Sequence, residues 1–227
     1  MKWQYIHKKS IDNGLIPIIE VFKSIEGEGS RAGFPVVFIR LAGCNMCCDY
    51  CDTRYASNPN ENDIHWTSYQ DLVCKVLSYG CTNVTITGGE PLLHESFIMK
   101  FCKRFESVFD INIETNGSII LDELLKMDVT LTVDCKCPSS NESMCKFASR
   151  LRERDVLKFV VADNKDLEFV QEYLYKYNTP AQKFIHPVFG EIDLKQLAQF
   201  VMDNEILELR LGIQLHKIIW DPNQRGV

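Results

Sequence analysis

The stretch LAGCNMCCDYCDT, residues 41–53, brings four cysteines within eight positions, directly after an apolar run that is typical of a β-strand. Cys44, Cys48 and Cys51 have the spacing C-x3-C-x2-C, and Cys47 is a fourth thiol beside Cys48. A tetrahedral zinc site usually needs a second, separated pair of ligands, and no such pair follows. Three closely spaced thiolates on one loop are suited to an iron–sulfur cluster that leaves one iron open to an outside ligand.

Short apolar runs alternate with segments of helical periodicity along the rest of the chain. The predicted strands are 17–22, 36–42, 83–87, 111–115, 129–134, 156–161, 183–189 and 209–220. The predicted helices are 67–79, 92–109, 144–154, 163–177 and 193–202. This alternation predicts an α/β fold with a parallel sheet and right-handed crossovers. A chain of 227 residues is suited to one domain spanning residues 1–227.

Reactive and polar segments follow the predicted strands at their carboxyl ends. The cysteine loop follows the second strand, GGEP the third, NG the fourth, CKCPSS the fifth, and HPVFG ends the seventh. A βα barrel or half-barrel gathers its active site at this edge. The segment 52–65 is rich in Asn, Asp, Ser and Pro, and we predict a loop there that closes over the same edge.

Composition excludes several kinds of partner. The net charge of −6 gives no positive field for a phosphate backbone, so nucleic acid is not an expected partner. The N-terminus lacks the apolar core of a signal peptide, and no run reaches the roughly 20 apolar residues of a membrane span. We therefore expect a cytoplasmic protein without a membrane partner. Its ten cysteines indicate metal ligation or buried thiols, with Cys74 and Cys102 expected in the core.

The cysteine spacing, with Tyr50 just before Cys51, resembles the signature of the radical S-adenosylmethionine superfamily. The segment TGGEP at 87–91 resembles that superfamily's GGEP motif. The resemblance implies a partial (β/α)6-type TIM barrel, here with extra strands at the N- and C-termini. It also implies one 4Fe–4S cluster on Cys44, Cys48 and Cys51, with S-adenosylmethionine on the open iron as the source of a 5′-deoxyadenosyl radical.

Longer segments resemble the 7-carboxy-7-deazaguanine synthase family over nearly the whole chain. They are FKSIEGEGSRAGFPVVFIRLAGCN at 22–45, CDT at 51–53, QLHK at 214–217 and the closing Gly226-Val227. The resemblance implies a carbon–nitrogen lyase of queuosine or 7-deazapurine biosynthesis, a pathway of tRNA modification. Its substrate would be 6-carboxy-5,6,7,8-tetrahydropterin, which loses a hydrogen atom from C6, contracts its ring and releases ammonia. It implies Mg²⁺ as a second cofactor, a flavodoxin or ferredoxin reductant and a homodimer.

The same resemblance assigns residues to the site. Thr53 would bind Mg²⁺. The implied cofactor-binding residues are Tyr50, Asp52, Gly88, Gly89, Glu90, Asp134, Cys135, Lys136, Ile185, His186, Pro187 and Val188. The implied substrate-binding residues are Ile25, Glu26, Gly27, Glu28, Arg40, Thr87, His216 and Val227. Relatives often carry Ser-Pro-Lys in place of residues 134–136, and some carry Gln in place of His186.

Arg40 is a candidate site residue even without the family resemblance, because it is a permanent charge in an otherwise apolar strand. Its partner would be either the substrate carboxylate or a structural salt bridge. His216, expected in the last strand, would be either a neighbour of the substrate or a core histidine. A free terminus such as Val227 is ordinarily disordered, and the family resemblance instead brings its carboxylate to the pterin.

Three other functions remain open from the sequence. A glycyl-radical-enzyme activase shares the cysteine spacing and the barrel, although the IEGEG, CDT and QLHK segments argue against it. A ferredoxin-like electron carrier would need a fourth cluster ligand, and a zinc-stabilised interaction module would contain no iron.

An auxiliary cluster on Cys135, Cys137 and Cys145 lacks an evident fourth ligand. The roles of Cys47, Cys137 and Cys145 are left open.

Overall fold

The computed structural model describes residues 2–227 and is built around one nine-stranded sheet. The strands are β1 (Ile16–Ile25), β2 (Pro35–Leu41), β3 (His65–Thr67), β4 (Asn83–Gly88), β5 (Asp110–Thr115), β6 (Val129–Cys135), β7 (Val156–Val161), β8 (Gln182–Pro187) and β9 (Leu209–Leu211). Their order in the sheet is β3-β1-β2-β4-β5-β6-β7-β8-β9. From β2 to β9 all neighbours are parallel, whereas β1 is antiparallel to both β2 and β3. Six of these parallel strands, β2 and β4–β8, confirm the predicted partial barrel, with β9 as the extra strand at one edge and β1 and β3 at the other.

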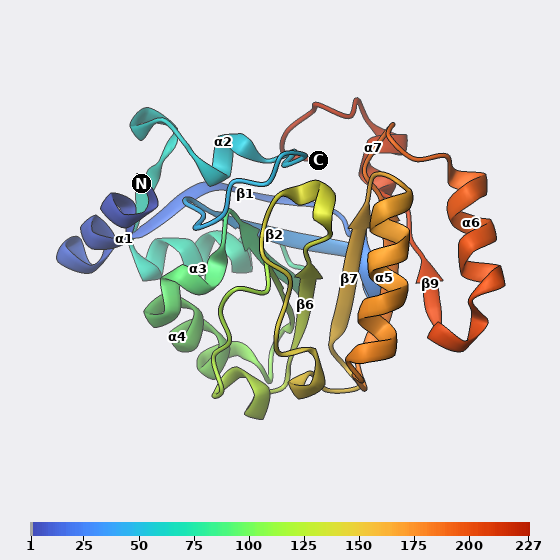
Figure 1. Cartoon of the computed structure of the whole chain (residues 1–227). Coiled ribbons are helices and arrows are strands. Elements are labelled where there is room, and N and C mark those ends of the chain that lie inside the picture. Colours follow the sequence, from blue (N-terminus) through green and yellow to red (C-terminus); the bar gives the residue numbers. More distant parts are fainter. Residues whose placement is uncertain (1) are drawn as a thin grey trace.

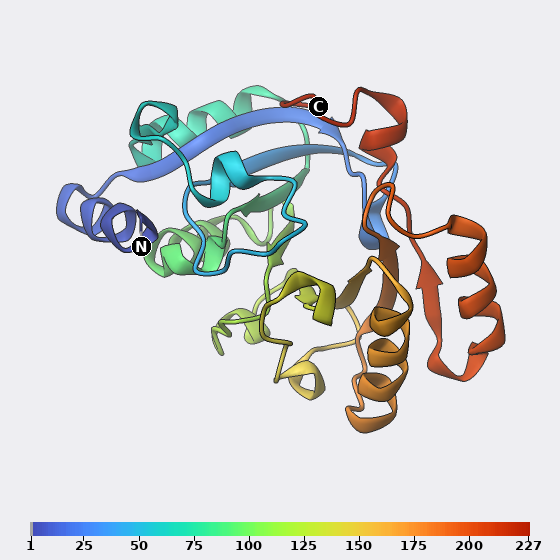
Figure 2. The ribbon, with the colours of Figure 1, turned by 45° about the horizontal axis from the view of Figure 1, so that its top comes forward.

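Most of the longer helices lie along the outside of the curved sheet, whereas the two shortest, Arg54–Ser57 and Leu215–Ile219, lie at its mouth (Figures 1 and 2). The α-helices are α1 (Lys2–Asn13), α2 (Arg54–Ser57), α3 (Tyr69–Ser78), α4 (Glu95–Phe105), α5 (Asn164–Lys176), α6 (Leu194–Asp203) and α7 (Leu215–Ile219). Single 3₁₀ turns occur at Gly29–Arg31, Glu61–Asp63, Pro91–His94, Leu124–Lys126, Pro138–Ser140, Ala148–Arg150 and Glu205–Leu207. Ser68, Asp163 and Asp193 cap α3, α5 and α6 by accepting backbone N–H bonds, as the sequence predicts for these helix starts.

The main core lies between the outer face of the sheet and these helices. On α4, Phe97, Phe101 and Phe105 recur every four residues and therefore share one face. Phe101 is fully buried and lies 5.1 Å, ring centroid to centroid, from Phe105. Period-2 alternation leaves the opposite face of the strands pointing into the barrel, and in β7 this places Lys158 inside, between the outward-facing Leu157 and Phe159. The barrel interior is consequently polar.

Two predicted elements are wrong. The run 209–220 alternates like a strand, but β9 ends at Leu211 and the chain turns into α7, with the amide of Leu215 donating to Gly27 O at 3.1 Å. His216 therefore lies in a helix. The predicted helix 144–154 is only a 3₁₀ turn, because the Arg152 guanidinium binds the carbonyls of residues 124, 125, 127 and 129 and holds its segment against the start of β6.

The segment 52–65 is more structured than the predicted loop. It contains α2 and a 3₁₀ turn and leads into the edge strand β3. Ala56 and Ile64 are buried in a small cluster with Ile6 of α1, Ile19 and Ala42. The segment is thus anchored against α1 and β1, and α1 itself, whose sequence is strongly polar, was not predicted.

No helix within residues 2–227 has the length and apolar character of a membrane span. All ten cysteines are free thiols. Cys102 is buried as predicted, but Cys74 is exposed, because α3 buries its Leu72 and Val76 side instead.

Replacing Phe101 by alanine tests the core. We expect Phe101→Ala to lower the free energy of unfolding by about 3–5 kcal/mol, since a large cavity forms where no side chain can collapse into it. Phe34 is 58% exposed, and Phe34→Ala is the control, with an expected loss below about 1 kcal/mol. Urea unfolding at one pH measures both, and equal losses would contradict the assignment of the core.

Candidate active site

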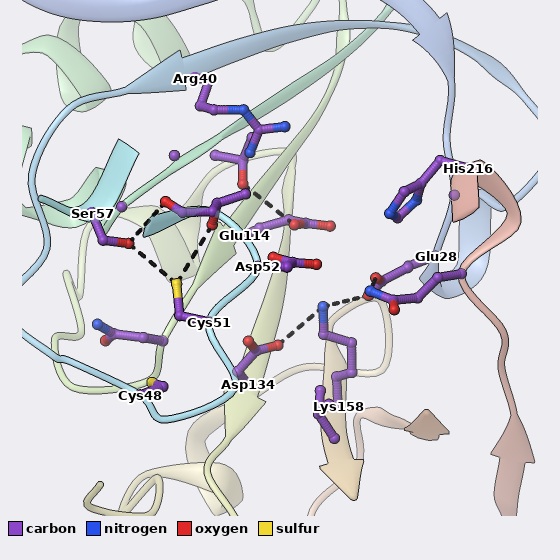
Figure 3. A pocket seen from close by; sticks show the side chains of 18 of the residues that line it. Glu28, Arg40, Cys48, Cys51, Asp52, Ser57, Glu114, Asp134, Lys158 and His216 are labelled. Carbon is purple, nitrogen blue, oxygen red and sulfur yellow. Dashed lines mark hydrogen bonds and ion pairs between the residues drawn. The ribbon is translucent and has the colours of Figure 1, made fainter. Parts of the chain in front are cut away.

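A cavity of about 230 Å³ opens at the carboxyl ends of the parallel strands. Figure 3 shows the side chains that point into it from several strands and loops. Most of the residues singled out by the sequence line it. They are Ile25, Glu26, Gly27, Glu28, Arg40, Cys44, Cys48, Tyr50, Cys51, Asp52, Thr53, Thr87, Gly88, Gly89, Asp134, Lys136, Val188, His216 and Val227. The fold therefore brings segments from both ends of the chain to one site.

The cysteine loop is held by α2. The amide of Gly43 donates to Ala56 O at 2.8 Å, and the amide of Cys44 donates to Ser57 O at 3.1 Å. The Ser57 hydroxyl also lies 3.4 Å from the Cys51 sulfur. Cys44, Cys48 and Cys51 line the cavity, whereas Cys47 is exposed and does not. The local structure thus separates the three thiols of the C-x3-C-x2-C pattern from the fourth.

The loop after β4 lies against the cysteine loop without any intervening side chain. The amide of Gly89 donates to Leu41 O at 3.1 Å, and the amide of Glu90 donates to Gly43 O at 2.8 Å. A Cβ at Gly89 would lie 2.1 Å from Gly43 O, and one at Gly88 would lie 2.1 Å from Leu41 O. Glycine is therefore required at both positions by the neighbouring backbone itself.

Glu90 supports the site from beneath rather than lining it. Its carboxylate accepts bonds from the amides of Leu92 and Asn116 and from the hydroxyl of Thr115, at 2.9, 2.7 and 2.8 Å. Asn116 in turn donates to the Cys44 sulfur at 3.6 Å. Burial raises the pKa of Glu90 to about 7. Both oxygens of the Glu90 carboxylate are thus engaged within the protein, and the cofactor contact implied for this residue stays a prediction.

The donor set suits an iron–sulfur cluster better than a single ion. Among residues 2–227, no three His, Cys, Asp or Glu side chains converge tightly enough to hold one metal ion. Cys44, Cys48 and Cys51 all line one open cavity, as three thiolates holding a cubane cluster would. Burial raises the pKa of Cys44, and it raises the pKa of Cys48 to about 11, although Lys136 opposes this. Cluster binding must therefore release protons from these thiols.

Charged side chains pair across the other end of the cavity. Glu26 is buried and accepts from the Thr85 hydroxyl at 2.6 Å and from Arg31 at 3.3 Å. Arg40 donates from Nε to Glu20 at 2.7 Å, so the structural salt bridge considered for it is present. Arg40 nevertheless lines the cavity. A role in substrate binding thus remains compatible with this pairing.

Five predicted residues do not line the cavity: Glu90, Cys135, Ile185, His186 and Pro187. Cys135 and Ile185 are packed in the main core. Strand alternation explains Cys135, because Asp134 and Lys136 on either side of it face the cavity. His186 is 1% exposed, and neither ring nitrogen has a hydrogen-bond partner among the described residues. These residues lie behind the cavity wall, and the cofactor contacts that the resemblance implies for them stay predictions.

Comparison with known proteins agrees with this geometry. A family model described as "4Fe-4S single cluster domain" matches residues 25–156. The 7-carboxy-7-deazaguanine synthase of Clostridium acetobutylicum is 40% identical over 92% of this chain and 98% of its own length. The enzyme of the same name from Methanospirillum hungatei is 36% identical over 95% of this chain and 90% of its own. This chain belongs to the 7-carboxy-7-deazaguanine synthase family.

The fold of this chain is also found in a solved structure. The crystal structure of QueE from Escherichia coli superposes with a TM-score of 0.71 over 92% of this chain and 97% of that one, at 23% sequence identity. The chain is thus an enzyme of the radical S-adenosylmethionine type with a 4Fe–4S cluster, as the sequence predicts. An electron carrier or a zinc module does not fit this family membership.

Several cavity-lining residues of this member of the 7-carboxy-7-deazaguanine synthase family were missed by sequence reasoning. Those lining the cavity are Phe22, Phe38, Ser57, Glu114, Thr115, Asn116, Lys158, Val160, Phe189, Gln214 and Lys217. Glu114 and Lys158 carried the same signal as Arg40, a charge in an apolar strand. Burial raises the pKa of Glu114 to about 7, although Lys158 opposes this. Phe22 and Phe38 stack at 5.1 Å and form an aromatic part of the wall.

The C-terminal tail returns to the cavity. Val227 lines it, and Arg225 lies over the Tyr55 ring of α2 at 3.8 Å. Lys217 of α7 pairs with Asp52 at 2.7 Å and so ties this helix to the cysteine loop. In Figure 2 the tail runs along the upper edge of the molecule beside β1. The role predicted for the terminal carboxylate stays a prediction.

Two adjacent cysteines give a matched test of the cluster ligands. After anaerobic reconstitution, we expect Cys48→Ala to lose the cluster, because only Cys48 faces the cavity, and Cys47→Ala to keep an iron content within about 20% of the parent. Iron and sulfide analysis with the visible absorption spectrum measures this. Loss of the cluster in Cys47→Ala with retention in Cys48→Ala would reverse the assignment.

Proposed function

We propose that this chain converts 6-carboxy-5,6,7,8-tetrahydropterin to 7-carboxy-7-deazaguanine by a Mg²⁺-dependent radical ring contraction with loss of ammonia. One observation carries the proposal: a single cavity joins the three thiols of the cysteine loop to a wall of paired charges and to the C-terminal residue. The name shared by the relatives supports the same reaction. The product would enter queuosine or another 7-deazapurine pathway.

Cys44, Cys48 and Cys51 would hold the cluster, and the glycines of TGGEP would lie against S-adenosylmethionine. When bound, these two groups would supply a 5′-deoxyadenosyl radical for hydrogen abstraction. Further cofactor contacts are proposed for the cavity-lining residues Tyr50, Asp52, Asp134, Lys136 and Val188. The pairing of Lys136 with Asp134 at 2.9 Å fixes that part of the wall. Its fixed charges would bind a polar ligand without reorganisation.

The opposite wall suits a carboxylated pterin. Phe22 and Phe38 offer an apolar face for a planar ring, and the buried Glu26 offers acceptor oxygens to a guanidine-like edge. Arg40, oriented by Glu20, would bind the substrate carboxylate, and the Thr53 hydroxyl would be a Mg²⁺ ligand. The remaining substrate contacts that we propose are Ile25, Gly27, Glu28, Thr87, His216 and Val227.

The assembly around this site is also part of the proposal. We propose that residues 1–227 act as one domain, that a flavodoxin or ferredoxin reduces the cluster, and that the protein forms a homodimer. Cys47 is exposed on the cysteine loop, so this loop is accessible to a reductant.

Anaerobic reconstitution tests the reaction directly. The protein is incubated with a reductant, S-adenosylmethionine, Mg²⁺ and the carboxytetrahydropterin, and the deazaguanine acid is measured by mass spectrometry. We expect product, and less of it when Mg²⁺ is omitted. Formation of 5′-deoxyadenosine without any deazaguanine product would reject this function in favour of a different radical enzyme, such as a glycyl-radical-enzyme activase.

Arg40 and Thr53 provide a prediction for substrate positioning. We expect Arg40→Ala and Thr53→Ala to lower product formation by roughly 100-fold while slow cleavage of S-adenosylmethionine continues, because the substrate loses its orientation and the cofactor does not. Arg154→Ala, which removes a half-exposed arginine paired with Asp128, is the control and should keep full activity. Full product yield from either site variant would overturn its role.

A further inference from the structure

Lys158 is a buried charge at the centre of the site. Its side chain is 7% exposed on the inner face of β7, where Nζ lies 2.7 Å from Glu28 and 3.1 Å from Asp134 (Figure 3). Burial alone would lower the pKa of Lys158, but Asp134, Glu28 and Glu114 raise it well above the ordinary value. The ammonium therefore stays charged between two carboxylates.

Glu28 has both oxygens engaged within the protein. Oε2 accepts from Lys158 at 2.7 Å, and Oε1 accepts from the side-chain amide of Gln214 at 2.7 Å. Burial would raise the pKa of Glu28, but Lys158, His186 and Gln214 together lower it. Lys158 thus connects three segments distant in sequence: the end of β6, the loop after β1 and the segment that leads into α7.

The barrel is open on this side. The sheet ends at β9 on one edge and at β3 beside β1 on the other, and β1 and β9 are not paired with each other. Two contacts bridge the opening besides the Glu28–Gln214 bond. The amide of Leu215 donates to Gly27 O at 3.1 Å, and the His216 ring lies so close to Gly27 that a Cβ there would be 2.3 Å from Nδ1. The bridge is therefore made by loops and side chains.

We propose that Lys158 is a positioning residue that closes the open side of the barrel: through Glu28 and Gln214 it holds the C-terminal segment, residues 213–227, across the cavity before substrate enters. This segment carries His216, Lys217 and Val227, all of which line the cavity. Lys158 thereby sets this part of the cavity wall from the inner face of β7.

The carboxylates around Lys158 explain why a positive charge is needed at this position. Without the ammonium, the Glu28 and Asp134 carboxylates face each other in a poorly solvated space and repel. Asp134 keeps a second partner in Lys136, whereas Glu28 keeps only the neutral amide of Gln214. Glu28 is therefore the group displaced, and the C-terminal segment moves with it. One consequence rests on the proposed function: a loosened wall would let the adenosyl radical be lost before the pterin reacts.

Hydrogen–deuterium exchange of the anaerobically reconstituted protein tests the closure without any turnover. We compare Lys158→Met and Gln214→Ala with Lys183→Met, a control on the adjacent strand β8 whose ion pair with the exposed Glu208 lies outside the cavity. We expect amides of residues 213–227 to exchange about tenfold faster in the first two variants, with α4 unchanged, and no change in Lys183→Met. Unchanged exchange in a folded Lys158→Met, judged by iron content and circular dichroism, overturns the proposal. If Lys158→Met does not fold, Gln214→Ala decides by the same criterion.

Product analysis then tests the consequence for the reaction. We expect Lys158→Met to raise the ratio of 5′-deoxyadenosine to deazaguanine product about tenfold, and Lys183→Met to leave it unchanged. Faster exchange of residues 213–227 with an unaltered product ratio would contradict the coupling between this segment and the reaction. It would still support the closure of the barrel by Lys158. If the parent protein itself forms no product, the proposed function fails, and the exchange data still judge Lys158.

Discussion

Two backbone hydrogen bonds between neighbouring strand ends set the position of the cysteine loop, and the rest of the site depends on them. The amides of Gly89 and Glu90 donate to Leu41 and Gly43, the last residues before the first cysteine. Parallel register pairs Leu41 with Gly88, so the GGEP loop and the cysteine loop leave the sheet at the same level. Any side chain at Gly89 would separate them, and the contact therefore links the two motifs physically.

The ion pairs in the polar interior of the barrel mainly fix the positions of their side chains. Buried ion pairs contribute little net stability, because desolvation offsets the attraction, but removing one partner leaves an uncompensated charge. The pairs Arg40–Glu20 and Lys158–Glu28 therefore fix side chains that would otherwise be mobile in a cavity. The apolar core against the outer helices supplies the stability that this interior does not.

Much of the fold follows from sequence because the strands are long apolar runs that end in polar turns. The site was predicted less completely. Lys158 and Glu114 are charged residues in apolar strands, as Arg40 is, and could have been predicted as site residues in the same way. Other failures have tertiary causes: residues 215–219 become helical because Leu215 must turn back to Gly27, and residues 144–154 are held in place by the guanidinium of Arg152. Such long-range contacts leave no periodicity in the sequence.

The central claim is an iron–sulfur cluster held by three thiols of this chain, with one iron open to S-adenosylmethionine. Mössbauer spectroscopy of the ⁵⁷Fe-reconstituted protein, recorded with and without S-adenosylmethionine, tests it most directly. The account predicts that one iron of the cluster changes its isomer shift when the cofactor is added, while the others keep theirs. A spectrum in which no iron responds, as expected for a cluster fully ligated by protein side chains, would contradict it.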